Sequence, residues 1–562
     1  MDVNIRIAGE AGQGVQTTGN LLVGALAGMG LSVFATQSYL SRIRGGLNWF
    51  DIRAADAQLF SAREAADLLV ALLPEALETL QPHMSDGGVV LLDGEEAGAT
   101  GCISLAFTKT AKEVGGSEVM ANAVAAGAAM RVLGYPLDGL LGFLSQEFKK
   151  KGEETIAKNR RCAEAGAKLF ASDPPRLAAP KASSRPVPIS NATQAIVLGA
   201  ATAGVKFVCG YPMTPGTGVL QGLAAVGDEF GIVVEQAEDE IAAVNMACGA
   251  VYAGVPALVA TSGGGFALMT EGVSLAGMLE LPLVIIIAQR PGPATGLPTR
   301  TAQQDLLFAL HAGHGEFPRA IYAPGTPEQA YHLTRRALET AHKHQSPVFL
   351  LSDQFLMDLQ TDTPTLDRTL RPIDRHILAD PPEDYLRYAV TESGVSPRAI
   401  PGGKAFVIVD SDEHTEDGHI TEDLEARVRI HDKRLRKTSG LRAEALAPER
   451  YGPEDAERLL ICWGSTYGPC REAVDLLGAE GASAAMLHFR QLWPLDAAAV
   501  RKAVAPKKKR APRQIFGVEG NATGQFAALL KTVGALAECK SVLKYDGLPF
   551  AGAEIAERVR HD

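Results

Sequence analysis

Glu240, a carboxylic acid at the start of an apolar run, is a residue of this sequence whose type and position suit acid/base chemistry. Acidic residues crowd the stretch 235–240, and Glu240 is followed at once by four apolar residues. Acids in a first helical turn favour the helix dipole, so capping with a solvated side chain is one interpretation. The apolar run favours another, in which Glu240 is buried. Burial raises the pKa of a carboxyl group, which can then hold or pass a proton.

Residues that could bind an anion follow other apolar runs of the same region. Thr214 lies between two prolines in YPMTP, where a fixed backbone would hold its hydroxyl and N–H in place. Arg290 ends an apolar run, Arg300 follows it, and the glycines of TSGGG allow the backbone to approach a ligand closely. Each feature alone also fits a rigid turn. If the strand ends converge, the set suits an anionic substrate handled by acid/base chemistry.

A glycine-rich turn near the N-terminus is a candidate for binding phosphate. Gly9-Glu10-Ala11-Gly12-Gln13-Gly14 follows an apolar strand and opens a helix, where free N–H groups suit an anion. Its G-x-x-G-x-G order differs from the dinucleotide fingerprint G-x-G-x-x-G, so a tight turn is an equal alternative. Farther on, Arg42 and Arg44 stand beside Gly45 and Gly46. They suit a carboxylate or phosphate, or else belong to a solvated loop.

The hydrophobic pattern predicts three α/β units that position these residues. The 562 residues suffice for three domains, and proline-rich stretches divide them. We predict domains over 1–172, 189–360 and 404–562, with a linker over 173–188 and an irregular connection over 361–403. Helices are predicted from about residue 17 and over 238–250 and 327–344. Short apolar runs indicate mainly parallel strands over 4–8, 89–92, 207–209, 231–235, 257–261, 283–288, 347–351, 459–463, 483–488 and 514–518.

Composition and charge argue against several classes of protein. A net charge of −11 and an aromatic content of 6% disfavour a nucleic-acid-binding surface, and the basic run over 507–510 fits a solvated loop. No apolar run approaches the ~20 residues that span a bilayer. The N-terminus lacks the features of a secretory signal. We therefore expect a cytoplasmic protein with no membrane or nucleic-acid partner.

Potential metal ligands are scattered along the chain. The seven cysteines include no C-x-x-C pair, which argues against an iron–sulfur cluster bound by this chain alone. His414 and His419, with Asp412, Glu413 and Asp423 nearby, form an acid-rich loop. The spacing of its histidines is a weak metal pattern, so a structural or subunit-contact role is the preferred interpretation. We predict no metal site in this chain.

Taken in order, the motifs resemble those of the 2-oxoacid:ferredoxin oxidoreductases over essentially the whole chain. GEAGQGVQTTGNLL and SRIRGG are similar to the γ domain, which in the two-subunit enzymes is fused to the N-terminus of the α subunit. YPMTP, EQAEDEIAA and TSGGGFALM resemble the thiamine-pyrimidine domain. GSTYGPCREAV, FRQLWP and GNATGQ resemble a third domain of the transketolase C-terminal type. Residues 412–423, with Lys433 and Arg434, are similar to the 2-oxoglutarate enzymes in particular.

Two motifs depart from the family pattern. Its usual Y-P-I-T-P-[SA]-[ST] has Met213 and Gly216 here, and its T-S-G-P-G has Gly264 in place of proline. Thr214 and the flanking glycines are kept, so we expect the site to be intact.

The resemblance implies an enzyme whose thiamine diphosphate, with Mg²⁺, binds between this chain and a separate β subunit. Glu240 would bond to the nitrogen of the pyrimidine ring, and burial would keep water from competing for that bond. Thr214 would hold the C1 carboxylate of the substrate, with Arg290 or Arg300 nearby. The other residues on the cofactor would be Tyr211, Pro212, Gly263 and Gly264.

The resemblance also implies partners. The γ-type region would contact coenzyme A, and the candidate residues for coenzyme A or substrate are Gly9, Gly12, Gln13, Gly14, Arg42 and Arg44. A [4Fe-4S] cluster and the diphosphate motif would lie on the β subunit, since this sequence contains no Gly-Asp-Gly. Electrons would pass to ferredoxin. The family implies an (αβ)2 assembly, in which this subunit alone is inactive.

The implied reaction converts 2-oxoglutarate and coenzyme A to succinyl-CoA and CO2 with reduction of ferredoxin. One alternative keeps the chemistry but uses pyruvate or another 2-oxoacid. An alternative of another class is a non-catalytic subunit that binds coenzyme A or a nucleotide. That alternative depends on the glycine-rich loops alone and leaves Glu240 beside YPMTP unexplained.

Overall fold

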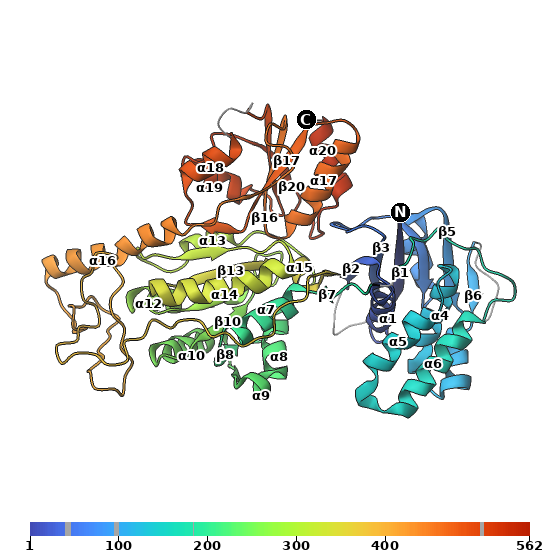
Figure 1. Ribbon diagram of the computed structural model, residues 1–562, viewed down its shortest axis with the longest axis horizontal. Helices are drawn as coiled ribbons and strands as arrows, with labels where there is room; N and C mark the ends of the chain where they lie inside the picture. Colours follow the sequence, from blue (N-terminus) through green and yellow to red (C-terminus); the bar gives the residue numbers. More distant parts are fainter. Residues whose placement is uncertain (40–45, 95–100, 184, 506–510, 562) are drawn as a thin grey trace. The chain divides into compact units, whose positions relative to one another are not determined.

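The computed structural model describes residues 1–39, 46–94, 101–183, 185–505 and 511–561. The chain folds into two compact units (Figure 1): Met1–Ser190 with Asp358–Thr365, and Asn191–Met357 with Leu366–Asp562. The described residues form three sheets flanked by helices, which confirms the predicted α/β class with mainly parallel strands. Among these residues, no helix has the length and apolar character that crossing a membrane requires.

The sheet of the first unit has the strand order β6-β5-β4-β1-β3-β2-β14-β7. β1 pairs in parallel with β4, but the pairs from β1 through β3, β2 and β14 to β7 are antiparallel, so this sheet is mixed. Only residues 39–46 separate β2 from β3, and so short a connection permits only antiparallel pairing. The strands are β1 (Asp2–Glu10), β2 (Ser32–Ser38), β3 (Leu47–Ala55), β4 (Ala66–Ala71), β5 (Met84–Asp93), β6 (Ile103–Leu105), β7 (Ile189–Ser190) and β14 (Gln360–Asp362).

Helices α1 and α4 cover one face of this sheet, and α2 covers the other. The stretch predicted as a linker runs along the same unit, since the N–H groups of Ser183 and Val187 donate to carbonyls at the end of α1. The helices are α1 (Val15–Gly28), α2 (Glu75–Leu80), α3 (Phe107–Thr110), α4 (Ala121–Val132), α5 (Asp138–Glu147) and α6 (Glu153–Ala167).

The second unit contains a sheet with the order β18-β12-β13-β11-β10-β8-β9, parallel except at the edge strand β18. The predicted strands of this sheet are confirmed to within two residues. Because β8, β10, β11 and β13 are parallel neighbours, their carboxyl ends lie at one edge, where such sheets bind ligands. The strands are β8 (Phe207–Gly210), β9 (Val233–Gln236), β10 (Ala257–Thr261), β11 (Val284–Gln289), β12 (Ala320–Tyr322), β13 (Val348–Asp353) and β18 (Gln491–Trp493).

Helices cover both faces of the parallel sheet. α10 and α12 pack against the inner residues of β10 and β11, whereas α7 and α14 pack together and α14 also contacts β13. α14 spans Pro327–His344 as predicted, and α10 begins at Glu240. The helices are α7 (Ala192–Thr202), α8 (Thr217–Ala225), α9 (Gly227–Phe230), α10 (Glu240–Tyr252), α11 (Gly263–Leu268), α12 (Thr270–Met278), α13 (Leu306–His311), α14 (Pro327–His344) and α15 (Gln354–Asp358).

The other sheet of this unit has the order β15-β17-β16-β19-β20 and is parallel except at β15. Its inner face shares one hydrophobic core with the larger sheet, since Trp463 and Phe489 belong to the same cluster as Ile285 and Ile287. Its strands are β15 (Glu449–Tyr451), β16 (Arg458–Trp463), β17 (Ala484–Phe489), β19 (Gln514–Glu519) and β20 (Lys540–Leu543). Its helices are α17 (Tyr467–Ala479), α18 (Ala497–Val504), α19 (Gln525–Thr532) and α20 (Gly552–His561).

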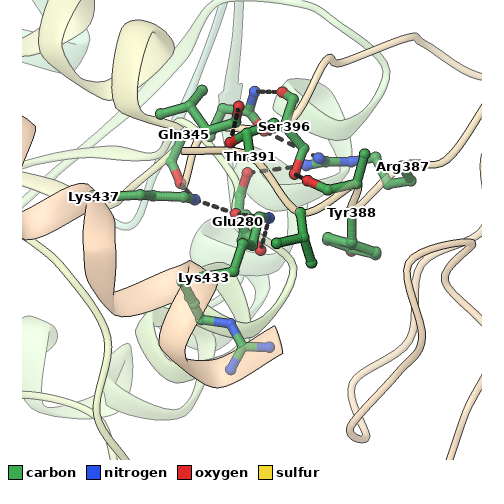
Figure 2. Close-up of polar contacts among 12 residues, drawn as sticks. Glu280, Gln345, Arg387, Tyr388, Thr391, Ser396, Lys433 and Lys437 are labelled. Carbon is green, nitrogen blue, oxygen red and sulfur yellow. Dashed lines mark hydrogen bonds and ion pairs between the residues drawn. The ribbon is translucent and has the colours of Figure 1, made fainter. Parts of the chain in front are cut away.

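A buried cluster of charged residues fastens residues 366–423, which form neither helix nor extended strand, and helix α16 (Leu424–Ala443) to the parallel sheet. Figure 2 shows Glu280 between Lys433 and Lys437 of α16. All three side chains are at most 1% exposed, and the Lys433 Nζ donates to both carboxylate oxygens at 2.7 and 2.9 Å. The Lys437 Nζ also pairs with Glu280 and donates to the Gln345 carbonyl oxygen at 2.9 Å. Arg387 donates to the carbonyls of Leu279 and Glu280 from the irregular segment.

The lysines keep Glu280 ionised although it is buried. Burial by itself would raise the pKa of Glu280, but the charges of Lys437 and Lys433 hold that pKa well below its ordinary value of 4.5. Breaking a buried pair by removing one partner leaves an uncompensated charge, which costs far more than an exposed pair is worth. Glu280 is therefore the residue on which the attachment of α16 depends.

We expect Glu280→Gln to lower the free energy of unfolding by about 3–5 kcal/mol, because two lysines would stay buried without a counter-charge. Urea denaturation followed by circular dichroism measures this. Asp380→Asn, which breaks the pair with Lys404 in which both side chains are 80% exposed, is the matched control. It should cost less than about 1 kcal/mol. Equal losses in the two variants would contradict the proposed role of the cluster.

The same pair predicts a dependence on pH. Because the pKa of Glu280 is lowered in the folded state, its contribution is present above about pH 4.5 and is lost as the pH falls toward the folded pKa. The stability difference between the native chain and Glu280→Gln should therefore shrink below about pH 4.5. A difference that stayed constant down to pH 3 would contradict this assignment.

Candidate functional site

Three segments meet at the carboxyl edge of the parallel sheet in the second unit. They are the loops after β8 and β11, which contain Met213 and Ala294, and the start of α11 after β10, which contains Gly264. A Cβ atom added to Gly264 would lie 3.6 Å from the Ala294 carbonyl oxygen and 3.9 Å from the Met213 Sδ. The strand ends therefore converge, as the sequence predicts.

Glu240 lies at the first position of α10, with its side chain turned away from water. Asp239 is the N-cap of this helix, and its carboxylate accepts a hydrogen bond from the Ala242 N–H at 2.7 Å. Asp239 thus does the capping, and Glu240 is 3% exposed, with a buried Oε1 that has no hydrogen-bond partner. Burial raises the pKa of Glu240, and the charge of Asp239 raises it further against a backbone hydrogen bond that lowers it. The predicted burial is confirmed, and the carboxyl group is favoured to keep its proton.

Gly265 leaves the room in which the Glu240 carboxyl group lies. A Cβ atom on Gly265 would be 2.4 Å from the Glu240 Oε1 and 2.2 Å from the Thr261 Oγ1. Both distances are far below a van der Waals contact, so any side chain here would displace the carboxyl group. The glycine at position 265 of the TSGGG motif is therefore required because no side chain fits there.

Arg290 contacts Thr214. Its Nη1 donates to the Thr214 carbonyl oxygen at 2.7 Å, and its own carbonyl accepts from the Gln304 Nε2 at 3.0 Å. Arg290 is half-buried, and burial lowers the pKa of its guanidinium. The bond brings the guanidinium after β11 against the loop after β8 that contains Thr214, and such a pair suits a carboxylate ligand.

The other predicted residues of this region lie around the same loops. Arg300 lies elsewhere, with its Cβ and Cγ against Gly547 of the smaller sheet's region, where a glycine Cβ would be 3.0 and 3.3 Å away. Tyr211 is 42% exposed at the end of β8, Pro212 is half-buried beside it, and Gly263 and Gly264 open α11. The structure thus joins Arg290 to Thr214 and places the Cβ and Cγ of Arg300 beside Gly547.

Sequence reasoning missed the segment that connects these loops to the smaller sheet. Gln303 is 2% exposed and makes hydrogen bonds with the Trp463 carbonyl oxygen at 2.7 Å and the Gly520 N–H at 2.8 Å. Its backbone bonds to Gly520 at 2.7 Å and to Asn521 at 3.0 Å. Gln304 contacts Arg290, and Asp305, also missed, bonds through its N–H to Gln289 at 2.9 Å. Only the run of polar residues Gln303-Gln304-Asp305 before an apolar stretch could have signalled it.

The glycine-rich loop of the first unit connects β1 to α1. Gly12 and Gly14 have φ of +95° and +82°, which favours glycine. The Gln13 Oε1 accepts from the Glu10 N–H at 2.8 Å, so this side chain closes the turn. A Cβ on Gly14 would lie 2.2 Å from the Asn122 Nδ2, and one on Gly9 would lie 2.9 Å from the Gln13 Oε1. The close packing accounts for the glycines, and Arg42 and Arg44 lie outside the described residues.

The two histidines of the acid-rich loop do different things. His414 is buried, its ring lies 3.9 Å from that of Tyr388, and its Nδ1 is 3.1 Å from the Asp412 carbonyl oxygen. The side chain of His419 is 65% exposed and pairs with Asp417 at 3.0 Å. Over the described ranges, no three His, Cys, Asp or Glu side chains gather as a metal site would require. Both histidines contact other residues of the irregular segment.

The neighbouring motif residues form ion pairs within the chain. Glu413 pairs with Arg434 at 3.1 Å and also with Arg427, which anchors the loop to α16. Lys433 forms a buried ion pair with Glu280. The stretch that most resembles the 2-oxoglutarate enzymes therefore holds the irregular segment in place.

Comparison with known proteins gives the same assignment for both units. A family model described as pyruvate flavodoxin/ferredoxin oxidoreductase, thiamine diP-binding, matches residues 198–433, and one described as pyruvate ferredoxin/flavodoxin oxidoreductase matches residues 4–169. The α subunit of a 2-oxoacid:ferredoxin oxidoreductase of Sulfolobus sp is 31% identical, covering 98% of this chain and 95% of the relative. The 2-oxoglutarate oxidoreductase subunit KorA of Mycobacterium tuberculosis is 30% identical, covering 100% and 91%.

A solved structure extends the similarity to three dimensions. The 2-oxoglutarate:ferredoxin oxidoreductase of Magnetococcus marinus, with 2-oxoglutarate, coenzyme A and succinyl-CoA bound, aligns with a TM-score of 0.89 at 32% identity. The alignment covers 100% of this chain and 99% of that chain.

The steric role of Gly265 predicts a difference between two adjacent glycines. We expect Gly265→Ala to lower the free energy of unfolding by about 1–3 kcal/mol, because the added methyl overlaps Glu240 and Thr261. Gly264→Ala meets only ordinary contacts and should be neutral or stabilising by up to about 1 kcal/mol, since alanine favours the helix. Urea denaturation of both variants checks this. Similar effects in the two would show that Gly265 has no special steric role.

Proposed function

The chain belongs to the 2-oxoacid:ferredoxin oxidoreductases as an α subunit, and from this premise we propose that it acts on 2-oxoglutarate. The proposed reaction interconverts 2-oxoglutarate, coenzyme A and oxidised ferredoxin with succinyl-CoA, CO2 and reduced ferredoxin. The observation that carries the catalytic part is the buried, unpartnered carboxyl of Glu240 within the thiamine-binding region. The substrate is supported by relatives named as 2-oxoglutarate enzymes and by the similar structure with 2-oxoglutarate bound.

The residues at the sheet edge fit the pyrimidine half of thiamine diphosphate. Glu240 presents an orphaned carboxyl oxygen, and Gly263 and Gly265 at the start of α11 leave the space in which the Asp305 and Glu240 carboxyl groups lie. When bound, thiamine diphosphate supplies the carbon nucleophile and the electron sink through which a 2-oxoacid loses CO2. We assign Tyr211 and Pro212, at the end of β8, to the same surface.

Glu240 would form a hydrogen bond to the ring nitrogen of the pyrimidine and could pass a proton to it. The hydrogen bond is strong because water is excluded from Glu240, which is 3% exposed. Arg290 and the hydroxyl of Thr214 bind the C1 carboxylate of the substrate. The bond from Arg290 to the Thr214 carbonyl links the loop after β11 to the loop after β8, so that the ketone would be presented in one orientation.

The remaining parts of the reaction need other surfaces and a partner. We place coenzyme A on the γ-type domain, residues 1–172, at Gly9, Gly12, Gln13 and Gly14. We place Mg²⁺ with the diphosphate, and the [4Fe-4S] cluster that reduces ferredoxin, on a β subunit in a cytoplasmic (αβ)2 assembly. The names of the relatives as α subunits support a partner chain. The linker over 173–188 and the domains over 189–360 and 404–562 complete this arrangement.

The role of Glu240 predicts loss of activity in the complex with the β subunit. We expect Glu240→Ala to lower coenzyme-A-dependent viologen reduction with 2-oxoglutarate by about 10²–10⁴-fold, as for loss of a group that moves protons in the reaction. Glu328→Ala, which removes an exposed acid from the first turn of α14, is the control and should be unchanged. Faster turnover of pyruvate than of 2-oxoglutarate would overturn the substrate assignment alone. Full activity of Glu240→Ala would overturn the mechanism.

The contact between Arg290 and Thr214 predicts which arginine binds the substrate. We expect Arg290→Lys to raise the KM for 2-oxoglutarate by about 10–100-fold, because a lysine cannot bond both Thr214 and a carboxylate in the same geometry. Arg300→Lys is the matched change in the same loop and should alter KM less than about threefold. The reverse ranking would assign the carboxylate to Arg300.

A further inference from the structure

Asp305 is a second acid at this sheet edge that the mechanism above does not use. It is 8% exposed, and its Oδ2 is buried without a hydrogen-bond partner. Asp305 occupies the N-cap position of α13, but its side chain makes no capping hydrogen bond. The usual reason for an aspartate at a helix start is therefore missing here.

The backbone holds Asp305 in a fixed place. Its N–H donates to the Gln289 Oε1 at 2.9 Å, and the Gln289 Nε2 donates to the Ser352 carbonyl oxygen at 3.1 Å. Two residues earlier, Gln303 is locked to the smaller sheet. The direction of the Asp305 carboxyl group is thus set by bonds on both sides of it.

The carboxyl group is directed at the glycine turn. A Cβ on Gly263 would lie 2.5 Å from the Asp305 Oδ2, while a Cβ on Gly265 would lie 2.4 Å from the Glu240 Oε1. Two buried carboxyl groups, each with an orphaned oxygen, therefore lie against the three glycines that begin α11. A buried carboxyl oxygen without a partner is costly, so a hydrogen-bond donor from outside the chain would stabilise each of them.

The chemistry of the proposed ligand supplies such a donor. The pyrimidine ring of thiamine diphosphate offers nitrogens that accept hydrogen bonds, and its exocyclic amino group is the only N–H donor of the neutral cofactor. Glu240, which the proposed function already assigns to the ring nitrogen, leaves the amino group without a partner. A carboxylate that accepts a hydrogen bond suits the amino group.

We propose that Asp305 is a second cofactor-binding residue of this site, and that its carboxyl group accepts a hydrogen bond from the amino group of the pyrimidine that Glu240 holds. This inference depends on the proposed function. It goes beyond it by assigning a second recognition contact, which explains why an acid without a capping bond lies beside the turn. An ordered water is the other source of the same kind of donor, and the experiment separates the two.

The experiment is a binding cycle on the co-expressed complex with its β subunit, stripped of thiamine diphosphate. Isothermal titration measures the affinity for thiamine diphosphate and for an analogue in which hydrogen replaces the amino group. We expect the analogue to bind the native complex about 10–100-fold more weakly, as for a hydrogen bond to a charged group. In Asp305→Ala that ratio should fall to about threefold or less. Asp305→Asn, which preserves the shape and keeps an acceptor oxygen, should give an intermediate ratio.

Asp496→Ala, which removes another aspartate from a helix start, is the control and should keep the native ratio, because Asp496 only caps α18. A purely structural role of Asp305, or a bond to water alone, would weaken both ligands equally and leave the ratio unchanged, which would overturn the proposal. Glu240→Ala distinguishes the two levels of inference. Unchanged thiamine diphosphate affinity in Glu240→Ala overturns the proposed function. Weakened affinity there, with an unchanged Asp305 ratio, overturns this inference alone.

Discussion

A carboxyl group binds a ring nitrogen weakly when water competes for the same hydrogen bond, and the parallel sheet of the second unit keeps water from Glu240. The apolar face of α10, with Val244 and Ala247, packs against the sheet and brings the first turn of the helix inside. Asp239 caps the helix, so Glu240 is free to turn inward. Gly265 supplies the space that the carboxyl group fills. Each of these features depends on β10 and α10 being neighbours, which the parallel topology provides.

The smaller sheet contributes to this site although none of its residues was expected there. Gln303 bonds with both its backbone and its side chain to residues after β16 and β19, and the next residues reach Arg290 and Gln289. β18 meanwhile leaves the smaller sheet's part of the chain and pairs with β12 of the larger one. With one shared core, the two sheets place the loops after β10 and β11 as a single rigid body. This rigidity gives the Asp305 carboxyl group its fixed direction.

The parts of the structure that follow from local patterns were predictable from the sequence. Buried parallel strands have continuous apolar runs, so β8, β10, β11 and β13 and the amphipathic α14 were found nearly to the residue. β3 was missed because charged residues interrupt its apolar pattern, and these pair across strands, as Arg6 does with Asp51 at 2.6 Å. The burial of Glu240 was predictable from the apolar run after it. The contact of Arg290 with Thr214, and the position of Asp305, depend on the course of the backbone between β11 and α13, which no periodicity encodes.

The role of Lys433 also could not be predicted from local sequence patterns. Its partner Glu280 shows that the environment of a buried acid decides the protonation and the role of that acid. Glu280 and Glu240 are both at most 3% exposed, yet their pKa values move in opposite directions. Two lysines surround Glu280, so it stays ionised and holds α16 and the irregular segment to the sheet. No cation is paired with Glu240 among the described residues, so burial dominates and raises its pKa. A carboxylate that has satisfied its charge within the fold has nothing left to offer a ligand. A buried carboxyl oxygen without a partner does, and this difference is why we propose Glu240 and Asp305 as the acids of the site.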